Sequence, residues 1–279
     1  MLKSKEILEK VSQAFVSDTF FTPVIGTELE FYLFSNSDTQ EIHDALSNMC
    51  VVKNFDIFDI KEEKGKNQFE ISLKHKNDVI KIADEICRLK QEISNLANEN
   101  NIIADFRAKP LPDDYGSSLH IHVSLLDQKN INILQKIGDE ESKEMHHAIA
   151  GLLDTMPASM QYLAPTEECY QRFVQKNDAP TTISWGGNNR TVAIRLPTST
   201  TEPHNRRIEH RLASAMADPY ISIAAVLAGI AHGIENKLNL TLPKIFGDAA
   251  LEQYAMQKLP ANLDEAKKIS HDKIQAWFK

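Results

Sequence analysis

Residues 20–35 read FFTPVIGTELEFYLFS, and this segment sets the fold class of the chain. Its apolar residues recur at every second position and many are aromatic or β-branched, which predicts a β-strand. In such a strand Glu28 and Glu30 project to one face, whereas Leu29 and Phe31 project to the other. Two carboxylates on one face repel each other unless a cation or arginines neutralise them. The pair therefore indicates a metal site, and a solvent-facing strand is the alternative interpretation.

The periodicity on either side of this strand switches between the helical and the extended pattern. Helical spacing is clearest at 77–98, which begins with Asn77 and Asp78 as candidate caps. The predicted elements are, in chain order, a helix at 3–16, strands at 20–35 and 67–75, a helix at 77–98, a strand at 118–126, a helix at 142–155, an irregular stretch at 156–182, strands at 191–197 and 206–213, a helix at 218–238 and a closing helix around 266–277. Strands and long helices without a regular strand–helix–strand alternation predict an α+β fold with a largely antiparallel sheet, in one domain.

The composition excludes several classes of protein. The chain has 279 residues, 42% hydrophobic and 25% charged, which is typical of a globular domain and not of a disordered or fibrous protein. Acidic residues outnumber basic ones by 39 to 31, and the net charge of -8 argues against a general affinity for nucleic acid or anionic membranes. The three cysteines are widely spaced, and no run approaches the roughly 20 apolar residues of a membrane span. We therefore expect a cytoplasmic protein that binds neither nucleic acid nor membrane.

Other predicted strands also place charged or metal-binding side chains two positions apart, on one face. His120 and His122 do so in SSLHIHVSL, where a structural role and a metal or phosphate role are equally open. Arg207, Glu209 and Arg211 do so in RRIEHRL, as either a ladder of surface ion pairs or a cation site beside phosphates. Further candidates are Arg190, Arg195, Glu70 and Glu63, the last of which is, taken singly, only a loop carboxylate.

Together these residues form a set of carboxylates, imidazoles and guanidinium groups on separate strands. Oxygen-rich sets of this kind suit Mg²⁺ or Mn²⁺, whereas zinc sites usually contain more His and Cys. Guanidinium groups hold phosphate oxygens in bidentate geometry and neutralise the charge that develops in phosphoryl transfer. Neither a G-x-x-x-x-G-K-[ST] loop nor a G-x-G-x-x-G fingerprint occurs in the sequence. The sequence therefore predicts metal-assisted phosphoryl transfer, with the nucleotide held by residues of the sheet.

In this order, the motifs resemble the catalytic domain of glutamine synthetase and its relatives, the γ-glutamyl amine and polyamine ligases. The resemblance runs from about residue 22 to the C-terminal LPANLDEAKK and rests on an E-x-E strand, an E…Q-x-E element, a KP…GS-x-x-H-x-H-x-S strand, an NR…IR-x-P hairpin and RRIE-x-R. It implies a curved, largely antiparallel sheet flanked by helices, two Mg²⁺ or Mn²⁺ sites and ATP as co-substrate. The residues implied for the two cations are Glu30, Glu63 and Glu70 for one and Glu28, His120 and Glu209 for the other.

The same resemblance implies roles for residues around the cations. Those implied for ATP and its phosphates are His122, Ser124, Arg190, Arg195 and Arg207. Those implied for glutamate are Gly116, Arg172 at the α-carboxylate and Arg211 near the reacting γ-carboxylate. ATP would phosphorylate the γ-carboxylate, and an amine would then displace phosphate from the acyl phosphate. Asp178, on a mobile loop in the family, would deprotonate the amine.

The chain departs from the family pattern, so that three hypotheses stay open. Asp178 stands where the family usually has Glu, and Tyr115 stands where many members have Asn. The small N-terminal β-grasp domain would be missing and the C-terminus shortened, so we expect residues 1–279 to form a single catalytic domain that acts as a homo-oligomer or with a partner that supplies the missing domain. The first hypothesis is an active ligase that joins glutamate to ammonia or a larger amine. The second is a pseudoenzyme that binds metal and nucleotide without turnover, and the third is a metal hydrolase.

Overall fold

The computed structural model describes residues 2–35, 39–174, 178–198 and 205–278. The strands in these ranges are β1 (Thr22–Phe34), β2 (Ile57–Glu62), β3 (Gln68–Lys76), β4 (Ile103–Asp105), β5 (Leu119–Leu126), β6 (Trp185–Gly186), β7 (Ile194–Arg195), β8 (Ile208–His210) and β9 (Lys244–Ile245). The longer helices are α1 (Leu2–Thr19), α2 (Thr39–Val52), α3 (Val79–Glu99), α4 (Lys143–Leu163) and α6 (Pro219–Glu235). The short ones are α5 (Glu167–Tyr170), α7 (Leu263–Lys268), α8 (Asp272–Phe278) and the 3₁₀ turn η2 (Glu252–Tyr254).

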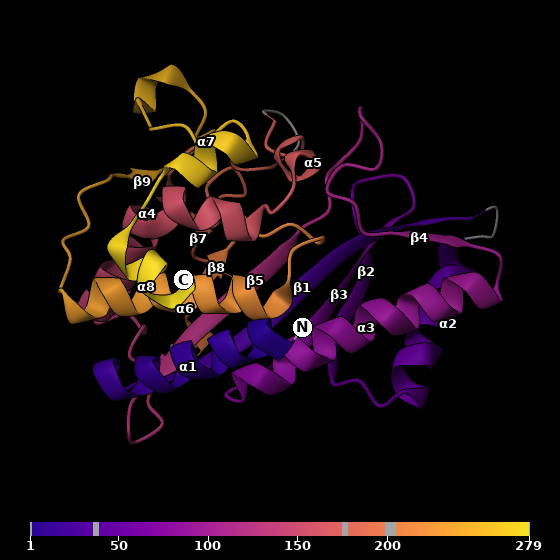
Figure 1. Ribbon diagram of the computed structural model, residues 1–279, viewed down its shortest axis with the longest axis horizontal. Helices are drawn as coiled ribbons and strands as arrows, with labels where there is room; N and C mark the ends of the chain where they lie inside the picture. The colour runs from indigo at the N-terminus through magenta and orange to yellow at the C-terminus, as the bar shows by residue number, and fades with distance from the viewer. Residues whose placement is uncertain (1, 36–38, 175–177, 199–204, 279) are drawn as a thin grey trace.

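All of these strands belong to one sheet, in the order β2-β3-β1-β5-β8-β7-β6-β9, with β4 beside the end of β1 (Figure 1). β1 is central because it pairs with β3 on one side and with β5 on the other. Every pairing is antiparallel except those of β6, which runs parallel to both β7 and β9. The prediction of an α+β fold with a largely antiparallel sheet is confirmed.

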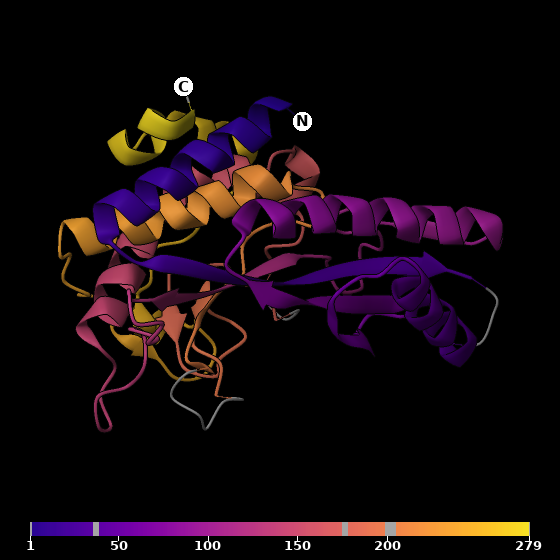
Figure 2. The same cartoon turned by 90° about the horizontal axis from the view of Figure 1, so that it is seen from below.

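The two faces of the sheet differ because side chains alternate along each strand. Leu29 and Phe31 of β1, Phe69 of β3 and Ile121 of β5 point to one face and are at most 1% exposed. Helices α1, α3 and α6 lie across that face, as the side view shows (Figure 2). Apolar side chains of the strands and helices therefore meet in one core. The opposite face carries the polar side chains of the same strands.

Side-chain caps define where two of the long helices begin. Asp78 precedes α3, and its carboxylate accepts a hydrogen bond from the backbone N–H of Lys81 at 2.9 Å. Asp218 precedes α6 and accepts from the N–H of Tyr220, also at 2.9 Å. Such caps satisfy N–H groups that have no partner inside the helix. The cap that the sequence predicts at Asp78 is confirmed.

Helix α4 is longer than the sequence predicts. The predicted helix ends near residue 155, whereas α4 continues to Leu163 with Pro157 inside it. Proline removes one helical hydrogen bond, but the following turns are held by packing, and Met160 is fully buried. α4 also lies very close to α6, since a Cβ added to Gly151 would be 2.3 Å from the carbonyl oxygen of Gly229. Tertiary burial thus outweighs the local cost of the proline.

Three other regions differ from the prediction. The closing helix predicted around 266–277 is divided into α7 and α8, because Ile269 adopts an extended conformation between them. The strand-like runs at 191–197 and 206–213 contribute only the short strands β7 and β8. Helix α2 and strand β2 lie where the sequence predicts no element. Within the described part of the chain, the length and apolarity needed to cross a bilayer are not combined in any helix.

Candidate active site

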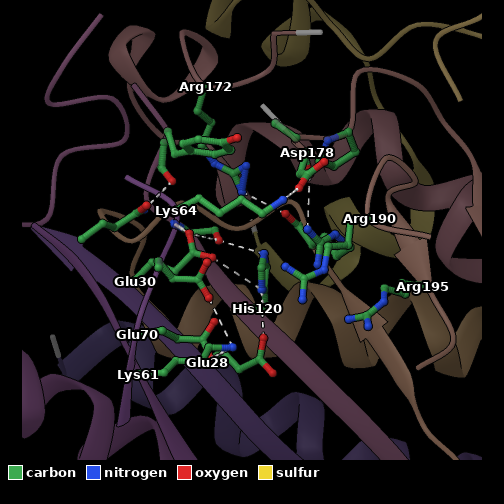
Figure 3. A pocket seen from close by; sticks show the side chains of 18 of the residues that line it. Glu28, Glu30, Lys61, Lys64, Glu70, His120, Arg172, Asp178, Arg190 and Arg195 are labelled. Atoms are coloured by element: carbon green, nitrogen blue, oxygen red, sulfur yellow. Dashed lines mark hydrogen bonds and ion pairs between the residues drawn. The ribbon is translucent and has the colours of Figure 1, made fainter. Parts of the chain in front are cut away.

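Strand register brings polar residues from five strands to the sheet face opposite the helices. The directly opposed pairs are Glu28 with His120, Glu30 with Glu70, His122 with Glu209, and Arg195 with Glu209. A cleft on this face is lined by most of the residues that the sequence singles out (Figure 3). Those at the cleft are Glu28, Glu30, Glu63, Glu70, Gly116, His120, His122, Arg172, Asp178, Arg190, Arg195, Arg207 and Arg211.

Glu28, His120 and Glu209 form one candidate cation cluster, with ligand atoms within 4.8 Å of one another. Nδ1 of His120 lies 3.1 Å from Oε2 of Glu28 and 3.7 Å from Oε1 of Glu209. Glu209 is fully buried, and its carboxylate also contacts Arg195 and Arg211. Burial acts to raise the pKa of Glu209, but Arg211 and the neighbouring histidines outweigh it and lower this pKa to about 2. The structure thus brings together the three residues that the resemblance implies for one cation.

Glu30, Glu70 and His120 form a second cluster, again with ligand atoms within 4.8 Å of one another. Among the described residues, Glu63 does not join the cluster, although the resemblance groups it with Glu30 and Glu70. Its carboxylate lies 3.2 Å from Nζ of Lys61, and the same Nζ lies 2.9 Å from Oε1 of Glu70. The ammonium group of Lys61 therefore bridges the carboxylates of Glu63 and Glu70.

In the second cluster, the ammonium group of Lys61 does not balance the charges that Glu28, Glu30 and Glu70 would carry if all three were ionised. Burial and the charges of Glu28 and Glu30 raise the pKa of Glu70 to about 9. Burial acts to lower the pKa of Lys61, but the charges of Glu70 and Glu63 outweigh it and raise this pKa above its usual value. Buried carboxylates with one imidazole and too little positive charge fit a divalent cation of the Mg²⁺ or Mn²⁺ class. The ammonium of Lys61 already supplies part of the positive charge that such a cation would bring.

Arginines line the other side of the cleft. Arg211, which is ion-paired with Glu209, also donates to the backbone oxygen of Asp178 at 3.3 Å. Arg172 is buried and donates to the backbone oxygens of Arg211 and Ala213 at 2.8 and 3.1 Å. Burial lowers the pKa of Arg172 to about 10. Among the described residues, the buried Nε of Arg172 has no hydrogen-bond partner, so this residue of the cleft keeps one unsatisfied donor.

Comparison with known protein families accounts for this arrangement. The family described as the catalytic domain of glutamine synthetase matches residues 37–275, which is most of the chain. The chain belongs to the glutamine synthetase family. The resemblance of its motifs is thereby confirmed at the level of the family.

Two curated members of the glutamine synthetase family illustrate the similarity. The γ-glutamylputrescine synthetase of Escherichia coli (strain K12) is 36% identical over 249 residues, which cover 78% of this chain and 52% of that protein. The glutamate–methylamine ligase of Methyloversatilis universalis is 32% identical over 226 residues, which cover 76% of this chain and 49% of that protein. The chain spans about half the length of these relatives.

A solved structure shows the same fold. The ligand-free structure of GmaS superposes with a TM-score of 0.86 and covers 99% of this chain and 69% of its own. The two sequences are 23% identical, so this likeness concerns the fold alone. The predicted glutamine synthetase-type catalytic fold is confirmed.

The loop carboxylate of this glutamine synthetase family member has a partner that the sequence did not reveal. Lys64 forms an ion pair with the carboxylate of Asp178 (Figure 3). The ammonium of Lys64 also lies 5.8 Å from the ring centre of Tyr115. Asp178 has a φ of 52°, in the left-handed region that Asp tolerates better than most residues. Lys64 follows Glu63 in an irregular segment, so no periodic pattern could indicate its role.

The side of the cleft formed by Gly116 and Arg172, which the resemblance implies for glutamate, is closely packed. A Cβ added to Gly116 would lie 2.7 Å from Cβ of Arg172, so a larger residue there would displace the arginine. Gln68 donates to the backbone oxygen of Gly116 at 3.0 Å, and Tyr32 donates to that of Tyr115 at 2.7 Å. Gln68 and Tyr32 thus position the segment that carries Gly116. Alternation along β3 predicts that Gln68 shares a face with Glu70, but it does not indicate the contact with Gly116.

Arg207 and His122 are among the residues that the resemblance implies for ATP, and Nε of Arg207 donates to Nδ1 of His122 at 3.1 Å. Ser124 does not line the cleft, and its hydroxyl instead donates to the backbone oxygen of Arg206 at 3.1 Å. A contact between Ser124 and ATP therefore stays a prediction. Arg190 is exposed and lines the cleft near Asp178 (Figure 3).

Proposed function

We propose that this chain is the catalytic domain of an ATP-dependent ligase that joins the γ-carboxylate of glutamate to ammonia or a larger amine. The observation that carries the proposal is the pair of cation clusters that share His120 on a sheet face bordered by arginines. Membership in the glutamine synthetase family supports it. The names of two relatives, γ-glutamylputrescine synthetase and glutamate–methylamine ligase, favour an amine acceptor larger than ammonia.

The clusters would hold Mg²⁺ or Mn²⁺ through Glu28, His120 and Glu209 and through Glu30 and Glu70. When bound, the cations would supply positive charge to the phosphates of ATP. Arg190, Arg195 and Arg207 would bind phosphate oxygens from the other side, because guanidinium groups match them in bidentate geometry. His122, which accepts from Arg207, would hold that arginine in place.

Arg172 and Arg211 would bind the carboxylates of glutamate. Arg172 is fixed by two backbone oxygens, and its buried Nε has no partner among the described residues, so a small movement that exposes Nε would let it donate to the α-carboxylate. Arg211 is anchored to Glu209 and lies between the first cluster and the Asp178 loop. This location suits the γ-carboxylate, which must meet both ATP and the amine.

The reaction would proceed in two steps, phosphorylation of the γ-carboxylate and then formation of the amide. A γ-carboxylate oxygen attacks the terminal phosphorus of ATP, and the bond to the bridging oxygen breaks to release ADP. The amine nitrogen then attacks the acyl carbon, the carbon–oxygen bond to phosphate breaks, and phosphate leaves. Asp178 would accept the proton that the amine loses. Since Lys64 pairs with Asp178, that ion pair must loosen as the amine enters.

The proposal extends to the compartment in which the chain works and to the chains with which it assembles. We propose that residues 1–279 act as one catalytic domain in the cytoplasm, together with further copies of the chain or with a partner chain. The family resemblance and the unpaired cysteines support this. A pseudoenzyme that binds nucleotide without turnover is a second candidate, favoured by the two lysines that already pair with Glu70 and Asp178.

Phosphate release from ATP tests the proposal, with Mg²⁺ or Mn²⁺ and with glutamate alone or combined with ammonium, methylamine or putrescine. We expect release that requires both glutamate and an amine. Asp178→Asn should reduce it by about 10²- to 10⁴-fold and leave ATP binding intact, whereas Asp139→Asn, at an exposed site away from the cleft, should have no effect. Cation-dependent ATP binding without release under any condition would instead establish the pseudoenzyme.

A further inference from the structure

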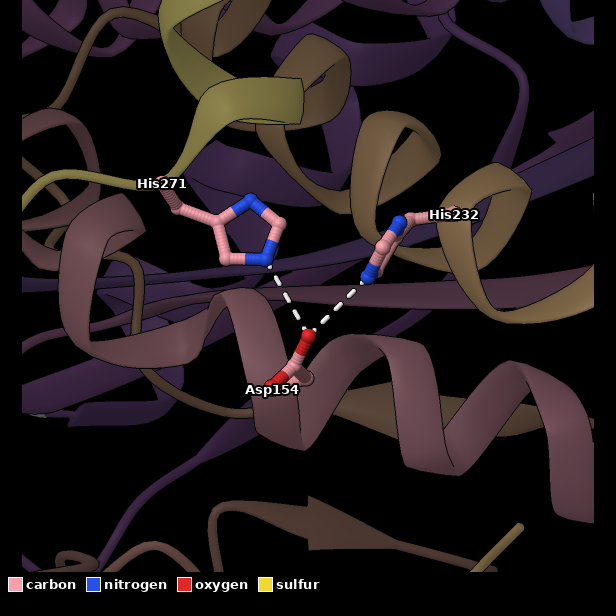
Figure 4. Close-up of side chains that lie close together, drawn as sticks. All are labelled: Asp154, His232 and His271. Atoms are coloured by element: carbon pink, nitrogen blue, oxygen red, sulfur yellow. Dashed lines mark hydrogen bonds and ion pairs between the residues drawn. The ribbon is translucent and has the colours of Figure 1, made fainter. Parts of the chain in front are cut away.

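A further group of side chains that can bind a metal ion lies outside the cleft. Asp154 of α4, His232 of α6 and His271 of the α7–α8 connection point toward one another (Figure 4). Their ligand atoms lie within 4.8 Å of one another, and none of the three residues lines the cleft. We propose that these residues bind a divalent cation of the zinc class, which ties the segment containing α8 to helices α4 and α6.

The distances suit a small cation. Oδ2 of Asp154 lies 2.9 Å from Nε2 of His232 and 3.1 Å from Nε2 of His271. In a tetrahedral zinc site with bonds of about 2.0–2.1 Å, ligand atoms are separated by roughly 3.3 Å. The two distances to Asp154 thus differ from this separation by a few tenths of an ångström, and the ligand nitrogens of the two histidines lie within 4.8 Å of each other. The side chain of Asp154 is 54% exposed, which leaves a fourth position open to water or another ligand.

The residues that carry these ligands are held in place by contacts of their own. Helices α4 and α6 approach so closely that a Cβ on Gly233 would lie 2.0 Å from the carbonyl oxygen of His147. On the other side, α8 docks onto α4, and the rings of Phe278 and Tyr162 stack with centroids 4.3 Å apart. Three separate elements thus present the three ligands before any ion binds, which reduces the entropic cost of binding.

Further contacts orient the two imidazoles. Nδ1 of His271 accepts from the backbone N–H of Lys273 at 3.3 Å, and Lys273 forms an ion pair with Glu235 of α6. Nδ1 of His232 lies 3.2 Å from Nδ2 of Asn236, whose side chain is exposed. In both rings Nε2 therefore points at Asp154, and Nε2 is the atom that would bind the ion. Burial acts to raise the pKa of Asp154, but hydrogen bonds from His271 and His232 outweigh it and lower that pKa below its usual value.

The choice of ligands indicates which ion binds. Two imidazoles and one carboxylate suit zinc and its neighbours, whereas Mg²⁺ and Ca²⁺ prefer oxygen ligands throughout. Binding requires each neutral imidazole to carry its proton on Nδ1 instead of Nε2, so that Nε2 can donate its lone pair to the ion. The cost is the long hydrogen bond from Lys273 and a rotation of the exposed Asn236 amide, which also gives up its 2.8 Å hydrogen bond to the backbone oxygen of His232. The site is thus distinct in chemistry from the carboxylate-rich clusters of the cleft.

Zinc titration of the whole chain by calorimetry tests the proposal, with excess Mg²⁺ present throughout. Any zinc bound by the clusters of the cleft should be the same in all variants, so a difference between variants reports on this site. We expect His232→Ala and His271→Ala each to bind about one zinc fewer than the unaltered chain. His75→Ala, which alters an exposed histidine of β3, is the matched control and should retain the full number.

Hydrogen exchange of α8 provides a second measurement that is independent of catalytic activity. Zinc should slow amide exchange in α8 of the unaltered chain and of His75→Ala, but not of His271→Ala, because only the first two keep the tie. Equal zinc binding by all four proteins would overturn the site, whatever the outcome of the ligase assay. Zinc binding that is lost in both variants, without any change in α8 exchange in the unaltered chain, would overturn the tie.

Discussion

The two faces of one sheet use the same strands for opposite purposes. On β1, Leu29 and Phe31 are buried beneath the helices, whereas Glu28 and Glu30 project into the cleft. The first face lowers the free energy of the folded state by removing apolar surface from water. The second face gathers carboxylates, and burial together with the charges of Glu28 and Glu30 raises the pKa of Glu70 to about 9. Stability and chemistry are therefore separated by the pleat of a single strand.

Removing a large side chain from the apolar face should have the largest effect. Phe31 is fully buried and packs beside Phe69 and Phe106. Phe31→Ala should lower the free energy of unfolding by about 3–5 kcal/mol, because it loses transfer energy and leaves a cavity. Urea unfolding measures this loss. Mn²⁺ affinity of the folded protein should stay unchanged, and a parallel loss of affinity would show that the faces are coupled.

Changing the polar face of the same strand should affect ligand binding instead. Glu28→Gln should weaken Mn²⁺ binding by at least about 10-fold, since it removes a charged ligand atom from the first cluster. The free energy of unfolding should change by no more than about 1 kcal/mol, because relief of repulsion offsets the lost contacts with His120 and His122. Manganese titration and urea unfolding check both values.

Glu62→Gln is the matched control for this change. Glu62 ends strand β2 on an exposed position and does not line the cleft. Its substitution should leave both Mn²⁺ affinity and stability unchanged. Equal effects of the two substitutions would contradict the separation of the faces.

The raised pKa of Glu70 predicts a pH dependence of cation binding. Below about pH 9 this carboxyl group is protonated in the absence of a cation, so a cation must displace its proton. Affinity should therefore rise with pH by up to about tenfold per unit between pH 6 and 8. Calorimetry in buffers of different ionisation enthalpy counts the released protons. Glu70→Gln should abolish this contribution, and unchanged proton release would refute the assignment.

Replacing the lysine that bridges Glu63 and Glu70 should have the smallest effect, in the opposite direction. Lys61→Met removes a positive charge that repels a cation at the second cluster and that the cation would have to displace from Glu70. Mn²⁺ should then bind about three- to tenfold more tightly, which corresponds to roughly 0.7–1.4 kcal/mol. Weaker Mn²⁺ binding would show that Lys61 supports the site instead of competing with the ion.

Much of the polar face follows from local patterns in the sequence. Two-residue alternation places Glu28 with Glu30 and His120 with His122, and the strand register confirms both pairs. It also places Arg207 with Glu209, and both contact residues of the cleft, His122 and Arg195. The pattern fails where no element was predicted or where the backbone is irregular. Lys61 lies on strand β2 directly opposite Glu70, but the sequence predicts no strand there. Lys64 lies in the irregular segment after β2, so no periodicity indicated its pairing with Asp178.

The helices show the same limit. Asp78 was predictable as a cap because its hydrogen bond reaches a residue only three positions away. The continuation of α4 through Pro157 was not, since it depends on packing against α6 some 70 residues further along the chain. Short strands such as β7 and β8 likewise owe their length to their neighbours in the sheet.

By itself, the sequence determined which residues share a face, because alternation along a strand is a property of the local backbone. It also determined the family, since the order of the motifs is written along the chain. The resemblance also implied that Glu209 meets His120 and Glu28, whereas only the tertiary structure decided that His271 meets Asp154 and His232 and that Lys61 bridges Glu63 and Glu70. Such meetings depend on strand register and helix packing between distant segments, which arise from burial of the whole core and not from any local pattern.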